Sequence, residues 1–232
     1  MAKYDRISTT MNQTEAIAGW LWLIFQLLGL PHLLRLANGA LGNPLNGGWI
    51  SFLFACINFL GVLVIFRSFL GRSVTDFGKS FLRCIRGAFL GFCVYYVSNL
   101  AMGNLMGFLF PWFSNVNDGQ VASLLGLNYL PMVIAAVVLV PVAEELLYRG
   151  ILFQTVYVKN RKLAWMLSTA LFCLIHVLPY IGSRDVLTLV LSFLQYIPAG
   201  LCLAWAYTES DNIFAPILIH AVVNAMGVYA VR

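Results

Sequence analysis

Apolar residues along this chain gather into long runs, and most of the charged residues lie between the runs. About 20 apolar residues in a helix span the hydrocarbon core of a bilayer. The pattern predicts seven spans, at residues 16–36, 49–66, 87–112, 127–158, 163–178, 186–207 and 213–231. The loops that connect them are short. We therefore predict an all-α, polytopic integral membrane helix bundle with about seven or eight transmembrane helices.

The composition excludes a soluble globular domain. Hydrophobic residues make up 61% of the chain and charged residues only 10%, whereas soluble domains carry about 25% charged residues. The formal net charge is +5, but the basic residues flank apolar runs and form no stripe with aromatic residues, so we expect membrane lipid as a partner and no nucleic acid. The five cysteines are irregularly spaced without a Cys-x-x-Cys pair, which argues against disulfides or a metal site.

Loop charges orient the predicted bundle. Basic residues concentrate at 67–86 and 159–162, and such loops face the cytoplasm, which also places the N-terminus there. The loop with Glu209 and Asp211 would lie on the same side although it is acidic. Within residues 1–120, which we assign as N-terminal transmembrane helices, apolar and basic positions near 70–86 alternate with a helical period. This indicates an amphipathic interfacial helix on the inner leaflet.

Two adjacent carboxylates, Glu144 and Glu145, follow an uncharged run in the fourth span. Ionised groups at such a depth are costly and mark function or pairing. Neighbouring helical residues point about 100° apart, so the two cannot face one point. Glu145 and Arg149 are four apart and can pair on one face. Glu144 is then free to face a cavity.

Three further polar residues reach comparable depths. Counting about 1.5 Å per residue from the basic turn at 159–162, Glu144 and His176 lie roughly 22 and 21 Å along their helices. His220 and Asn224 are four apart, which stacks them on one face of the last span. Taken alone, this last pair could equally be hydrogen-bonding contacts between helices. Gln195, Tyr196 and Pro198 on the sixth span are candidates for lining a cavity, although a kinked helix explains them equally well.

These residues form three motifs in order: Glu144-Glu145-x-x-x-Arg149, Phe172-x-x-x-His176 and His220-x-x-x-Asn224. The set resembles the signature of the CAAX-protease and bacteriocin-processing family, also called the abortive-infection family, of intramembrane proteases related to the CaaX prenyl endopeptidases. The resemblance covers the region 127–231, which we assign as the catalytic core. Residues 1–120 show no such signature.

The resemblance implies an intramembrane endopeptidase that hydrolyses peptide bonds of membrane-associated or lipid-modified substrates, including prenylated CaaX-type proteins. It assigns Glu144 as general base and His176 as its partner in activating a water. His220 and Asn224 would stabilise the oxyanion. Glu145 and Arg149 would support the site, and Phe172 would pack beside it.

Three alternatives stay open. Two histidines and a glutamate could bind zinc, although the absence of a His-Glu-x-x-His motif favours a mechanism without cofactors. The chain could instead be a non-catalytic membrane immunity or regulatory protein that binds a partner such as a sensor kinase. A proton-coupled transporter is the third alternative, but it predicts inverted repeats, which the sequence lacks. The oligomeric state is not predicted.

Overall fold

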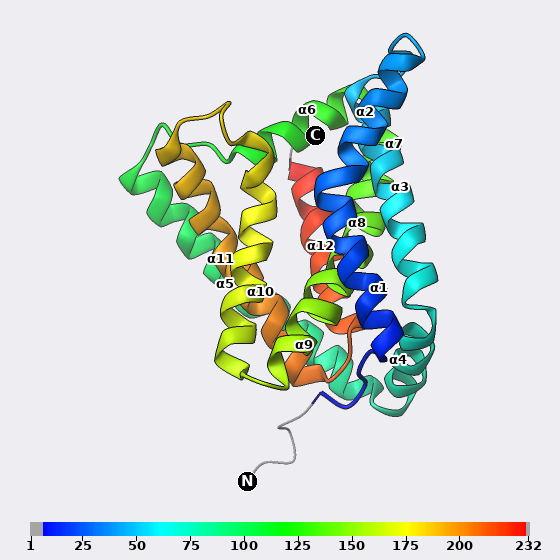
Figure 1. Cartoon of the computed structure of the whole chain (residues 1–232). Coiled ribbons are helices and arrows are strands. Elements are labelled where there is room, and N and C mark those ends of the chain that lie inside the picture. Colours follow the sequence, from blue (N-terminus) through cyan, green and yellow to red (C-terminus); the bar gives the residue numbers. More distant parts are fainter. Residues whose placement is uncertain (1–6, 231–232) are drawn as a thin grey trace.

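The computed structural model describes residues 7–230, and all regular secondary structure in that range is helical (Figure 1). Six continuous helical stretches in the described range are long and apolar enough to cross a membrane. They run Gln13–Ala40, Gly47–Ile65, Phe81–Leu109, Tyr129–Tyr157, Arg161–Tyr180 and Val186–Ser210. A shorter apolar helix, Phe214–Ala230, is the seventh. The prediction of a polytopic all-α membrane bundle is confirmed.

The first three stretches come from the N-terminal half of the chain. The first consists of α1 (Gln13–Ile24), the π-helical turn η1 (Phe25–Gly29) and α2 (Leu30–Ala40). The second is α3 (Gly47–Ile65) and the third is α5 (Phe81–Leu109). Two shorter helices connect these stretches to their neighbours: α4 (Arg67–Lys79) precedes α5, and α6 (Val116–Leu127) follows it.

The fourth stretch alternates between α-helical and π-helical segments. It consists of α7 (Tyr129–Ile134), the π-turn η2 (Ala135–Leu139), α8 (Val140–Glu145), the π-turn η3 (Leu146–Phe153) and α9 (Gln154–Tyr157). The fifth is α10 (Arg161–Val177) with the 3₁₀ turn η4 (Leu178–Tyr180). The last two are α11 (Val186–Ser210) and α12 (Phe214–Ala230).

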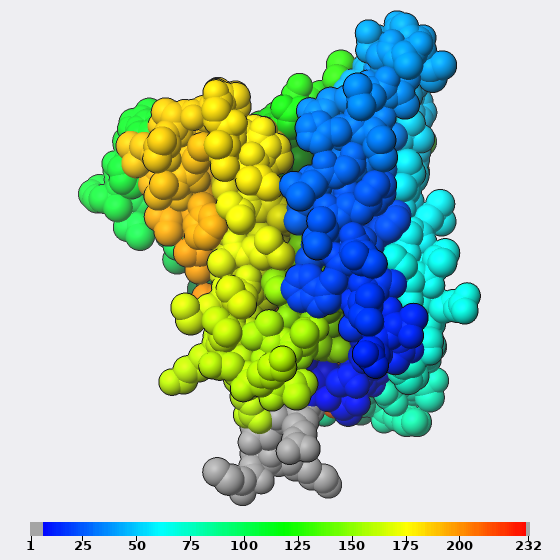
Figure 2. All heavy atoms as spheres, viewed as in Figure 1, coloured from blue at the N-terminus to red at the C-terminus, as the bar shows by residue number. Residues whose placement is uncertain are grey.

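The helices form two groups with α12 between them (Figure 1). One group contains α5, α10 and α11, and the other contains α1, α2, α3 and the fourth stretch. The central helix α12 contacts α5 and α11 on one side and η2 and α8 on the other. The two groups are in contact at the end of the bundle where α1 begins. They separate towards the opposite end, which leaves a hollow between them, and α6 lies behind this hollow (Figure 2).

The predicted amphipathic helix over 70–86 is wrong in one respect, because two helices share this segment. α4 ends at Lys79 and α5 begins at Phe81. Ser80 breaks the helix with φ −124° and ψ 29°. Its hydroxyl donates a 2.7 Å hydrogen bond to the carbonyl of Asp76, and its N–H donates to the same oxygen at 3.0 Å. Serine competes with helical hydrogen bonding in this way, and it closes α4.

The predicted acidic loop consists of the last turn of α11, with Glu209, and of Asp211 just after it, and it pairs with the start of α5. Arg86 Nη2 lies 2.8 Å from Glu209 Oε1, and Arg83 Nη1 lies 3.7 Å from Asp211 Oδ2. These acidic residues therefore lie at the same end of the bundle as the basic segment. Local neutralisation by Arg83 and Arg86 accounts for an acidic loop on a side that the sequence predicts to be basic.

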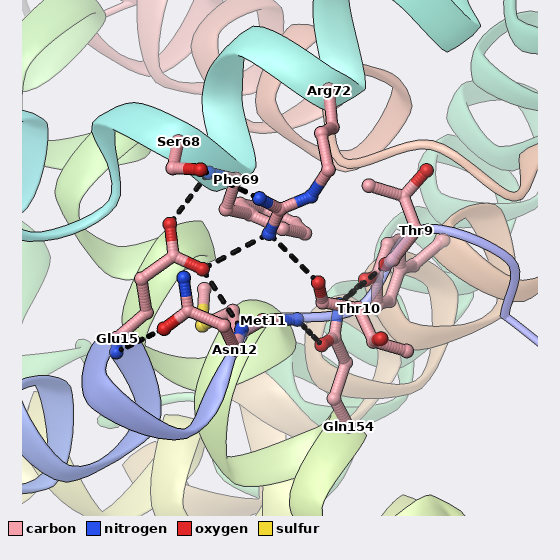
Figure 3. A network of polar contacts seen from close by, with 10 residues as sticks. Thr9, Thr10, Met11, Asn12, Glu15, Ser68, Phe69, Arg72 and Gln154 are labelled. Atoms are coloured by element: carbon pink, nitrogen blue, oxygen red, sulfur yellow. Dashed lines mark hydrogen bonds and ion pairs between the residues drawn. The ribbon is translucent and has the colours of Figure 1, made fainter.

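A polar network fixes the chain just before α1 (Figure 3). Asn12 and Glu15 form a capping box, in which each side chain accepts a hydrogen bond from the other's backbone N–H, at 2.8 and 2.9 Å. The other oxygen of Glu15 accepts a 2.6 Å bond from the N–H of Phe69 in the first turn of α4. Arg72 lies 3.0 Å from Glu15. Glu15, which the sequence analysis did not single out, thus caps two helices at once.

Candidate active site

The best-defined part of the site is a buried cluster around Glu145. Neither Glu145 nor Arg149 has an exposed side chain. Arg149 Nη1 donates to Glu145 Oε1 at 2.9 Å, so the ion pair expected from the four-residue spacing is present. His220 Nδ1 donates to the same oxygen, also at 2.9 Å. The cluster joins the fourth stretch to α12 through a single carboxylate oxygen.

Arg149 carries the cluster to two further helices. Its Nη2 donates to the carbonyl of Gly200 in α11 at 3.2 Å. Its guanidinium lies 4.6 Å from the ring centre of Phe172 in α10, a favourable position for a cation over an aromatic face. Phe172 is therefore more than packing, because its ring covers the cation at the centre of this cluster.

Glu144 points to the other side of His220. Its Oε2 is buried without a hydrogen-bond partner among the described residues and lies 3.9 Å from His220 Nε2. The Glu145 carboxylate can only accept, so Nδ1 of His220 carries a hydrogen. In the neutral ring Nε2 then has no hydrogen, and this nitrogen faces Glu144. The separation exceeds a hydrogen bond, but it is short enough for both groups to reach one shared water.

His176 makes different contacts from those the depth estimate suggests. Its Nδ1 donates a 2.7 Å hydrogen bond to the carbonyl of Phe172, one turn back in α10. Its ring stacks on Tyr196, with 4.2 Å between the ring centres. Within residues 7–230, no hydrogen bond or ion pair joins His176 to Glu144. The histidine beside Glu144 in the structure is His220.

Asn224 is placed by a proline on another helix. In the π-helical register of η2, each N–H donates to the carbonyl five residues back, as the N–H of Val140 does to Ala135. The donor for Ala136 in that register would be residue 141, which is proline and has no N–H. Asn224 Nδ2 instead donates to the carbonyl of Ala136 at 2.8 Å. The second amide hydrogen of Asn224 has no acceptor within residues 7–230.

A cavity of about 50 Å³ lies between α5, α10, α11 and α12, which is large enough for water. His176, His220 and Asn224 border it together with Phe172 and Tyr196. Glu144 is not among its lining residues. His220 connects the two regions, because it borders the cavity and faces Glu144 through Nε2.

Gly200 is a site residue that the sequence analysis did not identify. Besides accepting from Arg149, it lets α11 approach α10. A Cβ at this position would lie 2.8 Å from Thr169 Cγ2 and 3.1 Å from the Thr169 backbone Cα. No signal in a single sequence distinguishes this glycine from the others, because its role depends on which helix α11 packs against.

Replacing Gly200 by alanine is therefore expected to lower the free energy of unfolding by about 1–3 kcal/mol through overpacking. Thermal unfolding of the detergent-solubilised protein measures the effect. Gly103→Ala is the matched control, since Gly103 lies in α5 with nothing within 4 Å of the point that an added methyl group would occupy, and alanine there is expected to be neutral or stabilising. Equal stability of the Gly200→Ala variant and the wild type would contradict the close packing of α11 against α10 at Gly200.

The donor set does not fit a zinc centre. A catalytic zinc ion needs three protein ligands. In the part of the chain that the structure describes, no three His, Cys, Asp or Glu side chains lie close enough together to hold a metal ion.

The geometry describes a membrane-embedded carboxylate and histidine site, and comparison with known proteins relates it to a family. Residues 126–226 match the family described as type II CAAX prenyl endopeptidase Rce1-like. The match confirms the resemblance inferred from the three motifs. At the level of the family, it supports an intramembrane function of the CAAX-protease type.

A curated relative is similar over part of the chain. The UPF0177 protein YxdF of Lactococcus lactis subsp. lactis (strain IL1403) is 31% identical over 101 residues. The match covers 41% of this chain and 47% of that protein, so the similarity spans about half the length of the relative. No solved structure matches.

Proposed function

We propose that this protein is an intramembrane endopeptidase that hydrolyses peptide bonds of membrane-associated or lipid-modified substrates with a glutamate-activated water. The observation that carries the proposal is the buried Oε2 of Glu144, which has no hydrogen-bond partner among the described residues and lies 3.9 Å from His220 Nε2. The opposite nitrogen of that ring is fixed by the buried Glu145 and Arg149 pair. A carboxylate without a partner in a desolvated site has the properties of a general base.

The proposed chemistry divides the roles among four side chains. Glu144 takes a proton from the water that attacks the substrate carbonyl. His176 offers Nε2 as an acceptor for that water, since its Nδ1–H is committed to Phe172. The carbonyl carbon becomes tetrahedral and its oxygen gains negative charge. Glu144 then returns the proton to the leaving amine.

His220 and Asn224 suit the developing oxyanion. The hydrogen bond from His220 Nδ1 to the Glu145 carboxylate fixes the ring. A hydrogen bond to a carboxylate becomes stronger when its donor ring gains a proton. Glu144 lies 3.9 Å from His220 Nε2, so the proton that Glu144 takes from the water can be shared with that nitrogen, which then donates to the oxyanion until the proton passes to the leaving amine. Asn224 has a second amide hydrogen with no acceptor among the described residues, beside the same cavity. Donors that are fixed before the reaction stabilise such charge strongly in a water-poor site.

The substrate class follows from where these groups lie. Glu144 and His176 are carried by apolar helices that are long enough to span a membrane, and His220 and Asn224 by a shorter apolar helix that packs among them, so a substrate at or within the bilayer is the one best placed to reach them. A lipid-modified peptide is such a substrate. We also propose that the N-terminus faces the cytoplasm, because the basic segment and the acidic loop that it neutralises share that end.

The test is hydrolysis by the purified full-length protein in phospholipid vesicles. A peptide carrying a farnesylated cysteine three residues before its C-terminus is compared with the same peptide unmodified, and products are identified by mass spectrometry. We expect cleavage of the farnesylated peptide at a higher rate. Cleavage of neither peptide, nor of a myristoylated or palmitoylated counterpart, would contradict the proposal.

The same assay tests the absence of a metal step. Addition of EDTA or 1,10-phenanthroline is expected to leave the rate unchanged, because the proposed chemistry uses no metal ion. The control is a zinc peptidase assayed under the same conditions, which the chelators must inhibit. Loss of cleavage with chelator and its return with added zinc would show that the metal-free mechanism is wrong.

A further inference from the structure

The helix α6 is anchored to α11 by its first turn. It is not among the candidate spans, and it crosses the end of the bundle opposite to the N-terminus (Figure 1). Its N-cap residue Asn115 donates to Gln195 Oε1 at 2.9 Å, and the N–H of Val116 donates to Ser192 Oγ at 3.4 Å. The turn is therefore fixed to one face of α11, next to Tyr196.

The hydroxyl of Tyr196 is held by the same turn. Asn117 Nδ2 donates to it at 3.1 Å, and the hydroxyl donates to Asp118 Oδ1 at 3.0 Å. Tyr180, in the turn η4 that follows α10, donates to the amide oxygen of Asn117 at 3.4 Å. One end of the Tyr196 ring is thus tied to α6, and α6 is tied in turn to α10.

The face of the Tyr196 ring covers His176. The two ring planes are 30° apart with centres 4.2 Å apart, and both rings border the cavity. The hydrogen bond of His176 to the backbone of its own helix fixes one ring nitrogen but leaves the tilt of the ring plane to its neighbours. The Phe172 ring, 4.7 Å away between centres, and the closer, stacked Tyr196 ring therefore together limit the direction in which His176 Nε2 points across the cavity.

We propose that Tyr196 is a positioning residue for His176, and that Asn117 and Asp118 hold Tyr196 in place, so that the first turn of α6 belongs to the active site. The inference rests on the proposed function, since the direction of Nε2 matters only if His176 orients the attacking water. It assigns a role in hydrolysis to residues that lie outside the three motifs and outside the helices that carry them.

A histidine NMR spectrum tests the contact without any substrate. The chain has three histidines, so protein labelled with ¹³C,¹⁵N-histidine gives few ring signals, which His32→Gln and His176→Gln assign. The stacked Tyr196 ring shields the His176 ring protons. We expect Tyr196→Leu to abolish this shielding, and Tyr196→Phe, Asn117→Ala and Asp118→Ala to broaden or shift the His176 signals while leaving His32 unchanged. Tyr229→Phe, at a residue that is 80% exposed, is the matched control.

Kinetics on the farnesylated peptide supply the second measurement. Tyr196→Phe keeps the ring and loses its hydrogen bonds to the start of α6, so kcat is expected to fall by about 10-fold or more with KM nearly unchanged, as for misplaced catalytic groups. Tyr196→Leu should fall further. A merely structural role would lower the melting temperature without this split between kcat and KM.

The outcomes separate the two proposals. His176 signals that are the same in the wild type and the Tyr196 variants overturn the positioning role, whatever the activity. A wild type that cleaves the peptide with a Tyr196→Phe variant of equal kcat also overturns it and leaves the proposed function intact. A wild type that cleaves no peptide contradicts the proposed function, whereas the contact between Tyr196 and His176 is still decided by the spectrum.

Discussion

Replacement of Glu144 by glutamine is expected to lower the rate of peptide hydrolysis by about 100-fold or more, the contribution of a general base, while the protein keeps its fold. Glutamine has nearly the same shape but cannot accept the proton of the attacking water. Because Glu144 Oε2 is buried without a hydrogen-bond partner among the described residues, a neutral amide should not destabilise the bundle. Initial rates on the farnesylated peptide, together with a melting curve, measure both effects.

The matched control is Glu209→Gln. Glu209 lies at the end of the bundle, paired with the largely exposed Arg86, so its neutralisation should leave the rate unchanged. The assignment of Glu144 as the base is wrong if the Glu144→Gln variant retains the wild-type rate. A variant that no longer melts cooperatively would instead show that the carboxylate is needed for folding, and Glu144→Asp then tests the chemistry at constant charge.

Replacement of Arg149 by leucine is expected to destabilise the protein by about 3–5 kcal/mol, because it leaves the carboxylate of Glu145 buried without its cation. The variant also loses the contact with Phe172 and the hydrogen bond to Gly200. His220 loses the charged partner that orients it, so hydrolysis should fall as well. Denaturation in mixed micelles at fixed pH measures the stability change.

Two further variants test the cause of this loss. Arg86→Leu breaks the exposed pair with Glu209, and exposed pairs contribute only about 0–1 kcal/mol. The double variant Glu145→Leu, Arg149→Leu removes both buried charges, and it should regain part of the stability without regaining activity, since His220 has no acceptor for Nδ1. A double variant less stable than Arg149→Leu alone would contradict the ion-pair explanation.

The spans were predictable because the bilayer imposes a simple rule on composition. Each of the seven predicted runs corresponds to an apolar helix of the structure, with ends that differ by a few residues. The division of 70–86 into two helices was not predictable from its periodicity, since the apolar and basic positions continue in register through Ser80. The break depends on one hydroxyl that bonds to the preceding turn.

The residues of the site were predictable, but their pairing was predictable only in part. The four-residue spacing gave the pair of Glu145 and Arg149 correctly, because both lie on one continuous helix. Depth along separate helices gives a height but not a lateral position. It therefore did not reveal that His220, and not His176, lies beside Glu144.

The π-helical turns were a second obstacle. η3 begins directly after Glu145, so the rise of a regular α-helix does not apply between the basic turn and the carboxylates. Nothing in the composition of residues 146–153 distinguishes a wide turn from a regular one. Tyr196, by contrast, was a candidate for lining a cavity. Its hydrogen bonds to α6 depend on how α6 packs against α11, and a single sequence does not show that packing.

Pro141 shows what must accompany the motif residues in any transfer of this site. It precedes Glu144 by one helical turn, and the hydrogen that it lacks leaves the Ala136 carbonyl to Asn224. A designer who grafted only the glutamates, histidines and asparagine onto another bundle would let that carbonyl pair within its own helix. The asparagine amide would then turn freely, and the graft would reproduce the chemical groups without their alignment.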